Sequence, residues 1–287
     1  MQQGRIEMPT VLSIQSWVAC GNVGNTAALF PLQRLGCETW SLNTVAFSNH
    51  TGYGKWRGGA VPAKDIVDLF AGIAELGLLP RCDAVLSGYL GEAEAGPVLL
   101  DIVARVKQAN PKALFACDPV MGDVGPGWYV RAGVPEFYRD HAVAAADIVT
   151  PNRFELEWLT GRPVHTLAEA GEAAAVLRGR GPGTVLVTSL DLVPDGIAVV
   201  AAGPDGAWAA ETPRLPIEAT GCGDAVAALF LGWLLKGKML PEALALTVAA
   251  IYRVVEATMR SADGELALVA AQDELVSPTR SVPVRKL

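Results

Sequence analysis

Ala219-Thr220-Gly221-Cys222-Gly223-Asp224 is followed at once by an apolar run from Ala225 to Leu235, which only Gly232 interrupts. Glycine lets a backbone adopt φ angles that other residues avoid and approach a ligand closely. The first N–H groups of a helix have no partner within the helix, and the helix dipole favours negative charge beside them. The sequence therefore predicts a glycine turn that opens a buried helix and binds an anion.

Asp224 is the unusual member of this turn, because a carboxylate beside an anion site repels the anion. One explanation is general-base chemistry, in which Asp224 takes a proton from a hydroxyl that attacks phosphorus. The alternative is a carboxylate in the first turn of the helix that stabilises the helix dipole. The turn alone does not separate these two interpretations.

Strand-like and helix-like segments alternate through the rest of the chain. Such alternation is typical of a parallel sheet that helices cover on both faces. We therefore expect one α/β domain over residues 1–287, with residues 1–9 as a flexible N-terminus. The expected strands are 11–15, 38–43, 84–87, 114–117, 147–150 and 184–188, with an antiparallel edge pair at 197–201 and 208–211, and the expected helices are 26–35, 63–76, 94–109, 167–178 and 240–259.

The composition limits the class of protein. The 287 residues are 51% hydrophobic and carry a formal net charge of −7 without any basic block, so nucleic acid is not an expected partner. The five cysteines lie far apart and form no C-x-x-C pair, which favours reduced thiols in the cytoplasm over a disulfide framework or a zinc site. The first ten residues lack the apolar segment of a signal peptide, and no apolar run reaches about 18 residues, so we expect no membrane span.

Two segments suit a small-molecule ligand. Ser16 follows the first strand, and ligands of open α/β sheets lie beyond the carboxyl ends of the strands; the alternative for Ser16 is an ordinary turn serine. The segment Val45–Trp56 crowds small polar groups, aromatic side chains and glycines, as a planar aromatic ligand with polar edges requires. An exposed hairpin is the alternative for this segment, and His50 within it is interpreted as structural.

Acidic residues follow another predicted strand. Asp118 and Asp123 come after residues 114–117 and suit a hydrated Mg²⁺. Aspartates that cap a helix or a turn are the common alternative. The glycine-rich segment Val124–Gly133 comes next and is a candidate lid over the site.

Rival chemistries lack their motifs. There is no G-x-x-x-x-G-K-[ST], no G-x-G-x-x-G after the first strand and no G-x-S-x-G elbow, so a Walker-type NTPase, a dinucleotide-binding enzyme and an α/β-hydrolase are all unsupported. An anion turn with an aspartate, acidic groups beyond strands and a loop suited to an aromatic ligand together favour a kinase for a small hydroxyl compound.

The turn at 220–224 resembles the T-G-x-G-D signature of the ribokinase superfamily, and further motifs resemble the pyridoxal kinases within it, from about residue 11 to residue 287. This resemblance implies a three-layer α/β/α sandwich with a central, mostly parallel sheet. It also implies transfer of the ATP γ-phosphoryl group to the 5′-hydroxyl of pyridoxal, and of pyridoxine and pyridoxamine, in vitamin B6 salvage. The specific motif is F-S-N-H-T at 47–51, and the others are S-I-Q-S at 13–16, N-T-V at 43–45, S-G-Y-L-G at 87–91, C-D-P-V-M-G-D at 117–123 and T-P-N at 150–152 with Glu155.

The resemblance also implies roles by position. Asp224 would be the base for the vitamin hydroxyl. The phosphoryl group would be held by the amides of Gly221, Cys222 and Gly223. The pyridine ring would be surrounded by Ser16, Thr51, Gly52 and Tyr89. The ATP phosphates and their cations would lie along Asp118, Thr150, Glu155, Thr188 and Ser189, the nucleotide would border Ile217, Glu218, Ala219 and Thr220, and the metal ligands would be Asp118, Asp123 and Glu155.

Mg²⁺ with ATP, often a monovalent cation such as K⁺, and a homodimer are further implications of the resemblance. Two positions depart from the family pattern: Trp17 stands where histidine is frequent, and Thr188 stands where some bacterial members have lysine. We expect Thr188 to contact phosphate through its hydroxyl. Two rivals remain, a hydroxymethylpyrimidine kinase of the same superfamily and a non-catalytic binder of pyridoxal 5′-phosphate.

Overall fold

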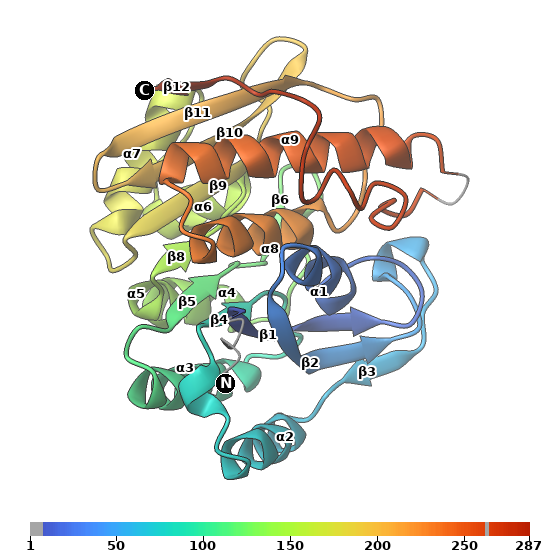
Figure 1. Ribbon diagram of the computed structural model, residues 1–287, viewed down its shortest axis with the longest axis vertical. Helices are drawn as coiled ribbons and strands as arrows, with labels where there is room; N and C mark the ends of the chain where they lie inside the picture. The colour runs from blue at the N-terminus through green and yellow to red at the C-terminus, as the bar shows by residue number, and fades with distance from the viewer. Residues whose placement is uncertain (1–7, 262–263) are drawn as a thin grey trace, which may run out of the picture.

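The computed structural model describes residues 8–261 and 264–287. The predicted flexible N-terminus therefore lies almost wholly outside the described residues. Helices cover both faces of one ten-stranded sheet, whose strand order is β12-β11-β10-β9-β8-β5-β4-β1-β2-β3 (Figure 1). This arrangement confirms the predicted α/β/α sandwich.

The sheet is parallel in its centre and antiparallel at its edges. The pairs from β2 through β1, β4, β5 and β8 to β9 are parallel, whereas β3 and β10–β12 pair in antiparallel fashion. A separate two-stranded sheet is made by β6 and β7. The strands are β1 Thr10–Val18, β2 Glu38–Phe47, β3 Gly58–Ala60, β4 Ala84–Ser87, β5 Leu114–Cys117, β6 Gly122–Asp123, β7 Gly127–Trp128, β8 Ile148–Val149, β9 Thr184–Leu190, β10 Gly196–Gly203, β11 Gly206–Pro213 and β12 Val284–Lys286.

Successive residues of a strand point to opposite faces of the sheet, so the side chains of each strand pack alternately into two hydrophobic cores, one on each face. Leu12 and Ile14 of β1 pack with helices α2, α3, α6 and α7, whereas Val11 packs with α1, α8 and α9. The helices are α1 Asn25–Arg34, α2 Ala63–Glu75, α3 Ala95–Ala109, α4 Val134–Phe137, α5 Val143–Ala145, α6 Arg153–Thr160, α7 Leu167–Arg178, α8 Cys222–Leu235 and α9 Leu240–Thr258.

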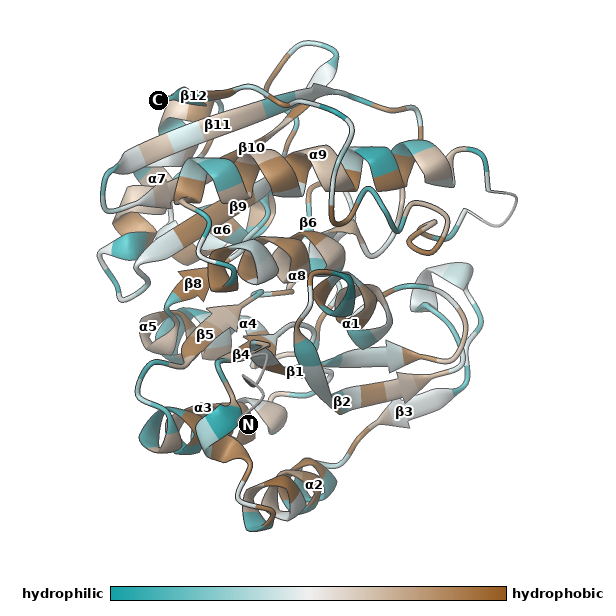
Figure 2. Cartoon of the chain, in the orientation of Figure 1, coloured by the Kyte–Doolittle hydropathy of each residue, from teal (hydrophilic) through white to brown (hydrophobic). Residues whose placement is uncertain are grey.

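Helix α8 is the buried helix that the glycine turn predicts. Its residues from Ala225 to Trp233 are all buried, and it lies between α1 and α9 as a largely brown ribbon (Figure 2). A helix that is hydrophobic on all sides is stable only inside a core. The anion turn is therefore held in place by the buried helix that it begins.

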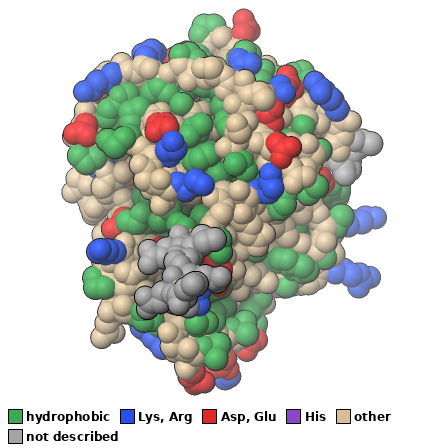
Figure 3. Space-filling view, viewed as in Figure 1, with side chains coloured by type: hydrophobic (Ala, Val, Ile, Leu, Met, Phe, Trp, Pro, Cys, Tyr) green, Lys and Arg blue, Asp and Glu red, His purple; other side chains and the backbone are tan. Residues whose placement is uncertain are grey.

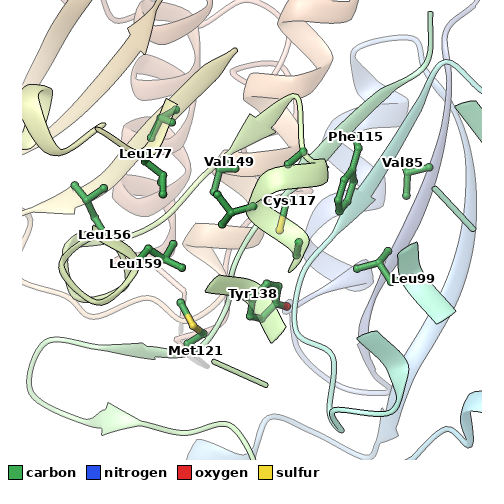
Figure 4. Packing of buried hydrophobic residues seen from close by; sticks show 14 of the residues in the cluster. Val85, Leu99, Phe115, Cys117, Met121, Tyr138, Val149, Leu156, Leu159 and Leu177 are labelled. Atoms are coloured by element: carbon green, nitrogen blue, oxygen red, sulfur yellow. The ribbon is translucent and has the colours of Figure 1, made fainter. Parts of the chain in front are cut away.

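The buried side chain of Tyr138 fixes the segment that follows β4. Tyr138 lies among Cys117, Val149 and other apolar side chains (Figure 4), and its hydroxyl donates a hydrogen bond of 2.7 Å to the carbonyl of Gly88. Buried hydroxyl groups need such a partner. The bond fixes the backbone immediately before Tyr89.

The observed strands differ from the predicted ones mainly at their ends. β1 runs on to Val18 through an irregularity between Gln15 and Trp17, and β2 runs on to Phe47. β3, β6, β7 and β12 are only two or three residues long, so they carry no periodic pattern that a sequence would show. Within the described part of the chain, no helix is long and apolar enough to cross a membrane. On the face seen in Figure 3, charged side chains of both signs are scattered among apolar and neutral ones.

Candidate active site

The carboxyl ends of the parallel strands meet at one edge of the sheet, where ligands of open α/β folds bind. Backbone hydrogen bonds between neighbouring chain segments continue past the ends of these strands. The amide of Asp118 donates to Ser87 (2.9 Å), that of Thr150 to Cys117 (3.0 Å), and that of Thr188 to Pro151 (2.9 Å). These bonds bring together three of the residues that are predicted on the ATP side.

The glycine turn packs against the loop that follows β1. Gly221 has φ +87°, and a Cβ atom added to it would lie 1.9 Å from the carbonyl oxygen of Asn22. Only glycine accommodates both this φ and this approach. A Cβ added at Gly223, by contrast, would meet no atom within 4 Å. The turn is therefore closed on the side of Asn22 and open beside Gly223.

Asp224 is partly buried beside the same loop. Burial raises the pKa of its carboxyl to about 6, and hydrogen bonds from the backbone N–H groups of Gly24 and of Asp224 itself limit the rise. Gly24 has φ +54°, and a Cβ on it would lie 2.2 Å from both the carbonyl oxygen and Oγ of Ser16. Gly24 therefore lies against Ser16, and its amide donates a hydrogen bond to Asp224. Through Gly24, these two predicted site residues lie close to one another.

Asp118 lies deep at the end of β5. It is 5% exposed and accepts a hydrogen bond of 2.9 Å from Oγ1 of Thr150. Burial, and then the negative charge of Asp224, raises the pKa of Asp118 to about 8. A buried carboxyl whose pKa is raised by a neighbouring carboxylate marks a place where a cation is stabilised.

Glu155 braces the backbone around the site. It is 3% exposed, and its two oxygens accept hydrogen bonds of 2.8 Å from the amides of Met121 and Asn152. Asn152 in turn accepts a bond of 2.9 Å from the amide of Glu155, so the two residues form a capping box at the start of α6. Burial and the charge of Asp118 raise the pKa of Glu155 well above its usual value.

The structure does not assemble the predicted three-carboxylate metal site of Asp118, Asp123 and Glu155. Among residues 8–261 and 264–287, no three His, Cys, Asp or Glu side chains lie close enough together to hold a metal ion. The oxygens of Glu155 are engaged by backbone amides. Asp123 is half-buried, accepts a bond of 2.7 Å from the amide of Val124, and has its pKa raised by burial and by the charges of Asp191 and Glu218.

Glu155→Ala should lower the free energy of unfolding by about 2–4 kcal/mol, because two buried amides would each lose their acceptor. Urea denaturation monitored by circular dichroism measures the loss. Glu169→Ala is the matched control: Glu169 closes a capping box at α7 and accepts from the amides of His165 and Thr166, but at the surface. An equally small loss in both variants would show that Glu155 does not brace the site.

The Val45–Trp56 segment begins at the end of β2, where Val45 is buried, and continues into the connection to β3, of which residues 51–56 are exposed. Residues 51–53 make an exposed helical turn between β2 and β3. His50 accepts a hydrogen bond of 3.1 Å from the amide of Gly52, in line with a structural role. We call residues 48–57 the flap. Its stem lies beside the loop after β1, because the amides of Ala19 and Cys20 donate to Phe47 and Ser48.

The other predicted contacts lie around this edge. Tyr89 is half-buried, and its carbonyl accepts a bond of 2.6 Å from Oγ1 of Thr44. Thr188 is buried beside Asn152, and Ser189 after it has the left-handed φ of +55°, rare for a residue other than glycine. Residues 217–220 lead directly into the turn, with Glu218 and Thr220 exposed.

The predicted lid is a hairpin built on β6 and β7. The ring of Trp128 packs edge-on against Phe154 (4.8 Å between centroids) and Trp158 (5.0 Å), which anchors the hairpin to α6. Tyr129 follows Trp128, is 48% exposed, and its amide donates a hydrogen bond of 3.2 Å to the carbonyl of Met121. Partial burial and the negative charges of Glu155 and Asp118 raise the pKa of its hydroxyl. Sequence reasoning missed Tyr129, as it missed Asn22 and Gly24, because only tertiary contacts bring these residues to the site.

Comparisons with known proteins show which family the chain resembles. The family model of the pfkB carbohydrate kinases matches residues 83–259. A pyridoxal kinase PdxY from Rubrobacter xylanophilus is 57% identical over 281 residues, which are 96% of this chain and 97% of the relative. The pyridoxal kinase of Leishmania donovani, solved with ADP and pyridoxine, is 30% identical, covers 97% of this chain and 99% of its own, and has a TM-score of 0.90.

The rival substrate class is also represented among the solved structures. A protein provisionally named a phosphomethylpyrimidine kinase, from Bacteroides thetaiotaomicron and solved with pyridoxal, is 25% identical with a TM-score of 0.89, over 98% of this chain and 100% of its own. The relatives at higher identity and the motifs at 47–51 and 220–224 point to one assignment. The chain therefore belongs to the pyridoxal kinases of the pfkB carbohydrate kinase family.

Proposed function

We propose that Asp224 is the general base with which this ATP-dependent pyridoxal kinase activates the 5′-hydroxyl of pyridoxal. The proposal rests on one observation: the carboxylate stands at the open glycine turn, oriented by the amide of Gly24, with a pKa of about 6. At neutral pH it is ionised and able to accept a proton. The hydroxyl proton passes to Asp224 as the new oxygen–phosphorus bond forms, and the bond from the γ-phosphorus to the bridging oxygen breaks to release ADP.

The turn amides support the transfer electrostatically. The N–H groups of residues 221–223 begin α8 and have no carbonyl partner within the helix. Donors fixed in advance at a helix N-terminus stabilise negative charge that spreads over the phosphoryl oxygens, at no cost of reorganisation during the reaction. A backbone N–H donates whatever side chain its residue carries, so Cys222 contributes through its amide and not through its thiol.

Mg²⁺ fits the acidic residues without a three-carboxylate cage. Mg²⁺ is usually bound through one or two carboxylates together with substrate phosphates and water. Asp118 supplies such a carboxylate, and Asp123 a second at the nucleotide side. When bound with ATP, the metal neutralises charge on the phosphates. The use of a monovalent cation such as K⁺ follows from the resemblance and is tested by initial rates over a K⁺ series.

Asp118→Asn should raise the Mg²⁺ concentration for half-maximal rate by about tenfold or more, the order expected when a metal site loses support. The amide keeps an acceptor for Thr150, so the fold should persist. Initial rates over a Mg²⁺ titration at saturating pyridoxal measure the shift. Asp191→Asn is the control, because Asp191 is a nearby carboxylate already paired with Arg153 at 3.2 Å. An unchanged Mg²⁺ dependence in Asp118→Asn would remove Asp118 from the cation site.

The substrate range is proposed as pyridoxal, pyridoxine and pyridoxamine. Leishmania donovani pyridoxal kinase was solved with ADP together with pyridoxine and with pyridoxamine, which supports ADP and these vitamers as ligands here. Ser16, Thr51, Gly52 and Tyr89 are proposed to read the ring. Polar groups left unpaired by a wrong ligand give strong discrimination.

Competition kinetics test this proposal. With pyridoxal and hydroxymethylpyrimidine present together, we expect kcat/KM to favour pyridoxal by about tenfold or more, a modest share of what unpaired polar groups can supply. A ratio near one would point to the pyrimidine kinase, and ATP binding without any transfer would point to a binding protein. Thr51→Val, which removes one hydroxyl at nearly constant volume, should reduce the ratio.

A homodimer, one domain over the whole chain and a cytoplasmic location complete the proposal. The continuous ten-stranded sheet supports a single domain, and five free cysteines support a reducing compartment. Light scattering of the purified chain tests the dimer.

A further inference from the structure

Glu265, at the start of the segment after α9, joins two distant parts of the chain. Its Oε2 accepts a hydrogen bond of 2.9 Å from the amide of Asn22, and its Oε1 accepts one of 2.6 Å from the hydroxyl of Tyr53. In Figure 1 this C-terminal segment lies next to α1 and the loop between β2 and β3. Hydrogen bonds to an ionised acceptor are shorter and stronger than neutral ones.

The first contact reaches the catalytic turn through one short loop. Residues 21–24 lie between Glu265 and the turn. A Cβ on Gly21 would lie 2.7 Å from Oε1 of Glu265, and the side chain of Asn22 donates a second bond, of 3.0 Å, to the carbonyl of Leu266. On its other side, the same loop contacts the glycine turn twice. The carbonyl of Asn22 lies against Gly221, and the amide of Gly24 donates a hydrogen bond to the carboxylate of Asp224.

The second contact reaches the substrate side. Tyr53 belongs to the flap, in the same helical turn as Thr51 and Gly52, and 58% of its surface is exposed. The stem of the flap is held by a hydrogen bond of 2.9 Å from the amide of Arg57 to Oγ of Ser48. A charged acceptor on Tyr53 therefore fixes the tip of an exposed hairpin.

We propose that Glu265 is a positioning residue. Its bond to Tyr53 fixes the flap over the B6 vitamer, and its bond to Asn22 fixes the loop that orients Asp224. The proposal rests on the general-base assignment above for its second half. In this role Glu265 is assigned no direct contact with the substrate or the phosphate. It acts through Tyr53 on vitamer binding and through Asn22 on the base.

Three variants separate the two contacts. Tyr53→Phe removes the hydroxyl that bonds Glu265 and leaves the Asn22 contact in place, so KM for pyridoxal should rise about threefold to tenfold while kcat stays within about twofold, the pattern of lost uniform binding. Glu265→Ala removes both bonds, so KM should rise similarly and kcat should fall by about tenfold, because small displacements of a base are costly. Glu265→Gln keeps an acceptor for Asn22 and should recover most of kcat.

Glu274→Ala is the matched control. Glu274 lies in the same C-terminal segment and accepts bonds of 2.7 and 2.8 Å from the amide and hydroxyl of Thr279, away from the loop and the flap. It should lower Tm without altering kcat or KM. Equal effects of Glu265→Ala and Glu274→Ala on both constants would overturn the positioning role, as would an unchanged KM in Tyr53→Phe.

Amide hydrogen exchange gives a reading that does not depend on turnover. Residues 48–57 should exchange faster in Glu265→Ala and Tyr53→Phe than in the unaltered chain or in Glu274→Ala. Equal exchange in all four proteins would overturn the flap contact. Faster exchange together with an active Asp224→Asn variant would keep that contact and instead overturn the general-base assignment.

Discussion

Asp224→Asn should lower kcat by about 10²–10⁴-fold, the usual contribution of a general base, while the Kd for pyridoxal and for Mg·ATP stays close to that of the unaltered chain. Asparagine has the same shape and still offers an oxygen to the amide of Gly24, so the loop and the turn should keep their geometry. Only the ability to take up the hydroxyl proton is lost. Single-turnover kinetics at saturating substrates, with circular dichroism to check the fold, measure the effect.

Glu242→Gln is the control for the alternative role of Asp224. Glu242 is also a carboxylate in the first turn of a helix, α9, and pairs with Lys238 at 2.6 Å. If Asp224 serves only the helix dipole, the two variants should behave alike, with small losses of stability and a normal rate. A near-normal kcat in Asp224→Asn would therefore remove the base from the mechanism.

The pH dependence of the rate follows from the same group. The folded pKa of Asp224 is raised to about 6, and the base works only when ionised, so kcat/KM should rise with pH and level off above neutrality. Below pH 6 it should fall about tenfold for each unit, as the fraction of ionised base falls. The residual rate of Asp224→Asn should lack this acid limb. Asp118 lies close enough to Asp224 that burial and the charge of Asp224 together raise its pKa to about 8, so an acid limb retained by Asp224→Asn would assign the titration to Asp118. The pKa values of Cys222 and Tyr129 are raised well above neutrality, so neither group can produce an acid limb.

The fold and half of the site follow from local signals in the sequence. The apolar run after Asp224 predicts a buried helix, because α8 has no polar face to leave in water. Strand–helix alternation then places Ser16, Asp118, Thr150 and Thr188 at one edge, since every central strand is parallel. None of these inferences needs a contact between distant residues.

The other half depends on contacts between residues far apart in the sequence. The position of Glu155 suggests a metal ligand, but one of its oxygens accepts a hydrogen bond from the amide of Met121, 34 residues away, and the other from the amide of Asn152. Asn22 and Gly24 look like ordinary loop residues until the turn at 221–224 packs on them. A pattern of residue types reports which groups are present, whereas tertiary packing decides which of them remain free for a ligand.

Gly221→Ala should lower kcat by about 10²-fold, although it changes neither a charge nor a hydrogen-bonding group, because a displacement of about 1 Å in a catalytic array costs that much. The new Cβ would lie 1.9 Å from the carbonyl oxygen of Asn22, far inside contact distance. The obstacle is backbone and cannot rotate away. Either the turn or the loop of residues 21–24 must move, and that loop carries the amide that holds Asp224.

Gly237→Ala separates the steric clash from the cost of a left-handed residue. Gly237 has φ +77°, close to the +87° of Gly221, but a Cβ on it would meet no atom within 4 Å, and it lies beyond the other end of α8. Both variants should lose about 1–2 kcal/mol of stability from the strained φ, which urea denaturation would show. Only Gly221→Ala should also lose kcat. If the two variants kept equal kcat, the approach of Asn22 to the turn would not govern the reaction, whereas a loss confined to Gly221→Ala would show that this backbone contact sets the position of the base and the phosphate amides together.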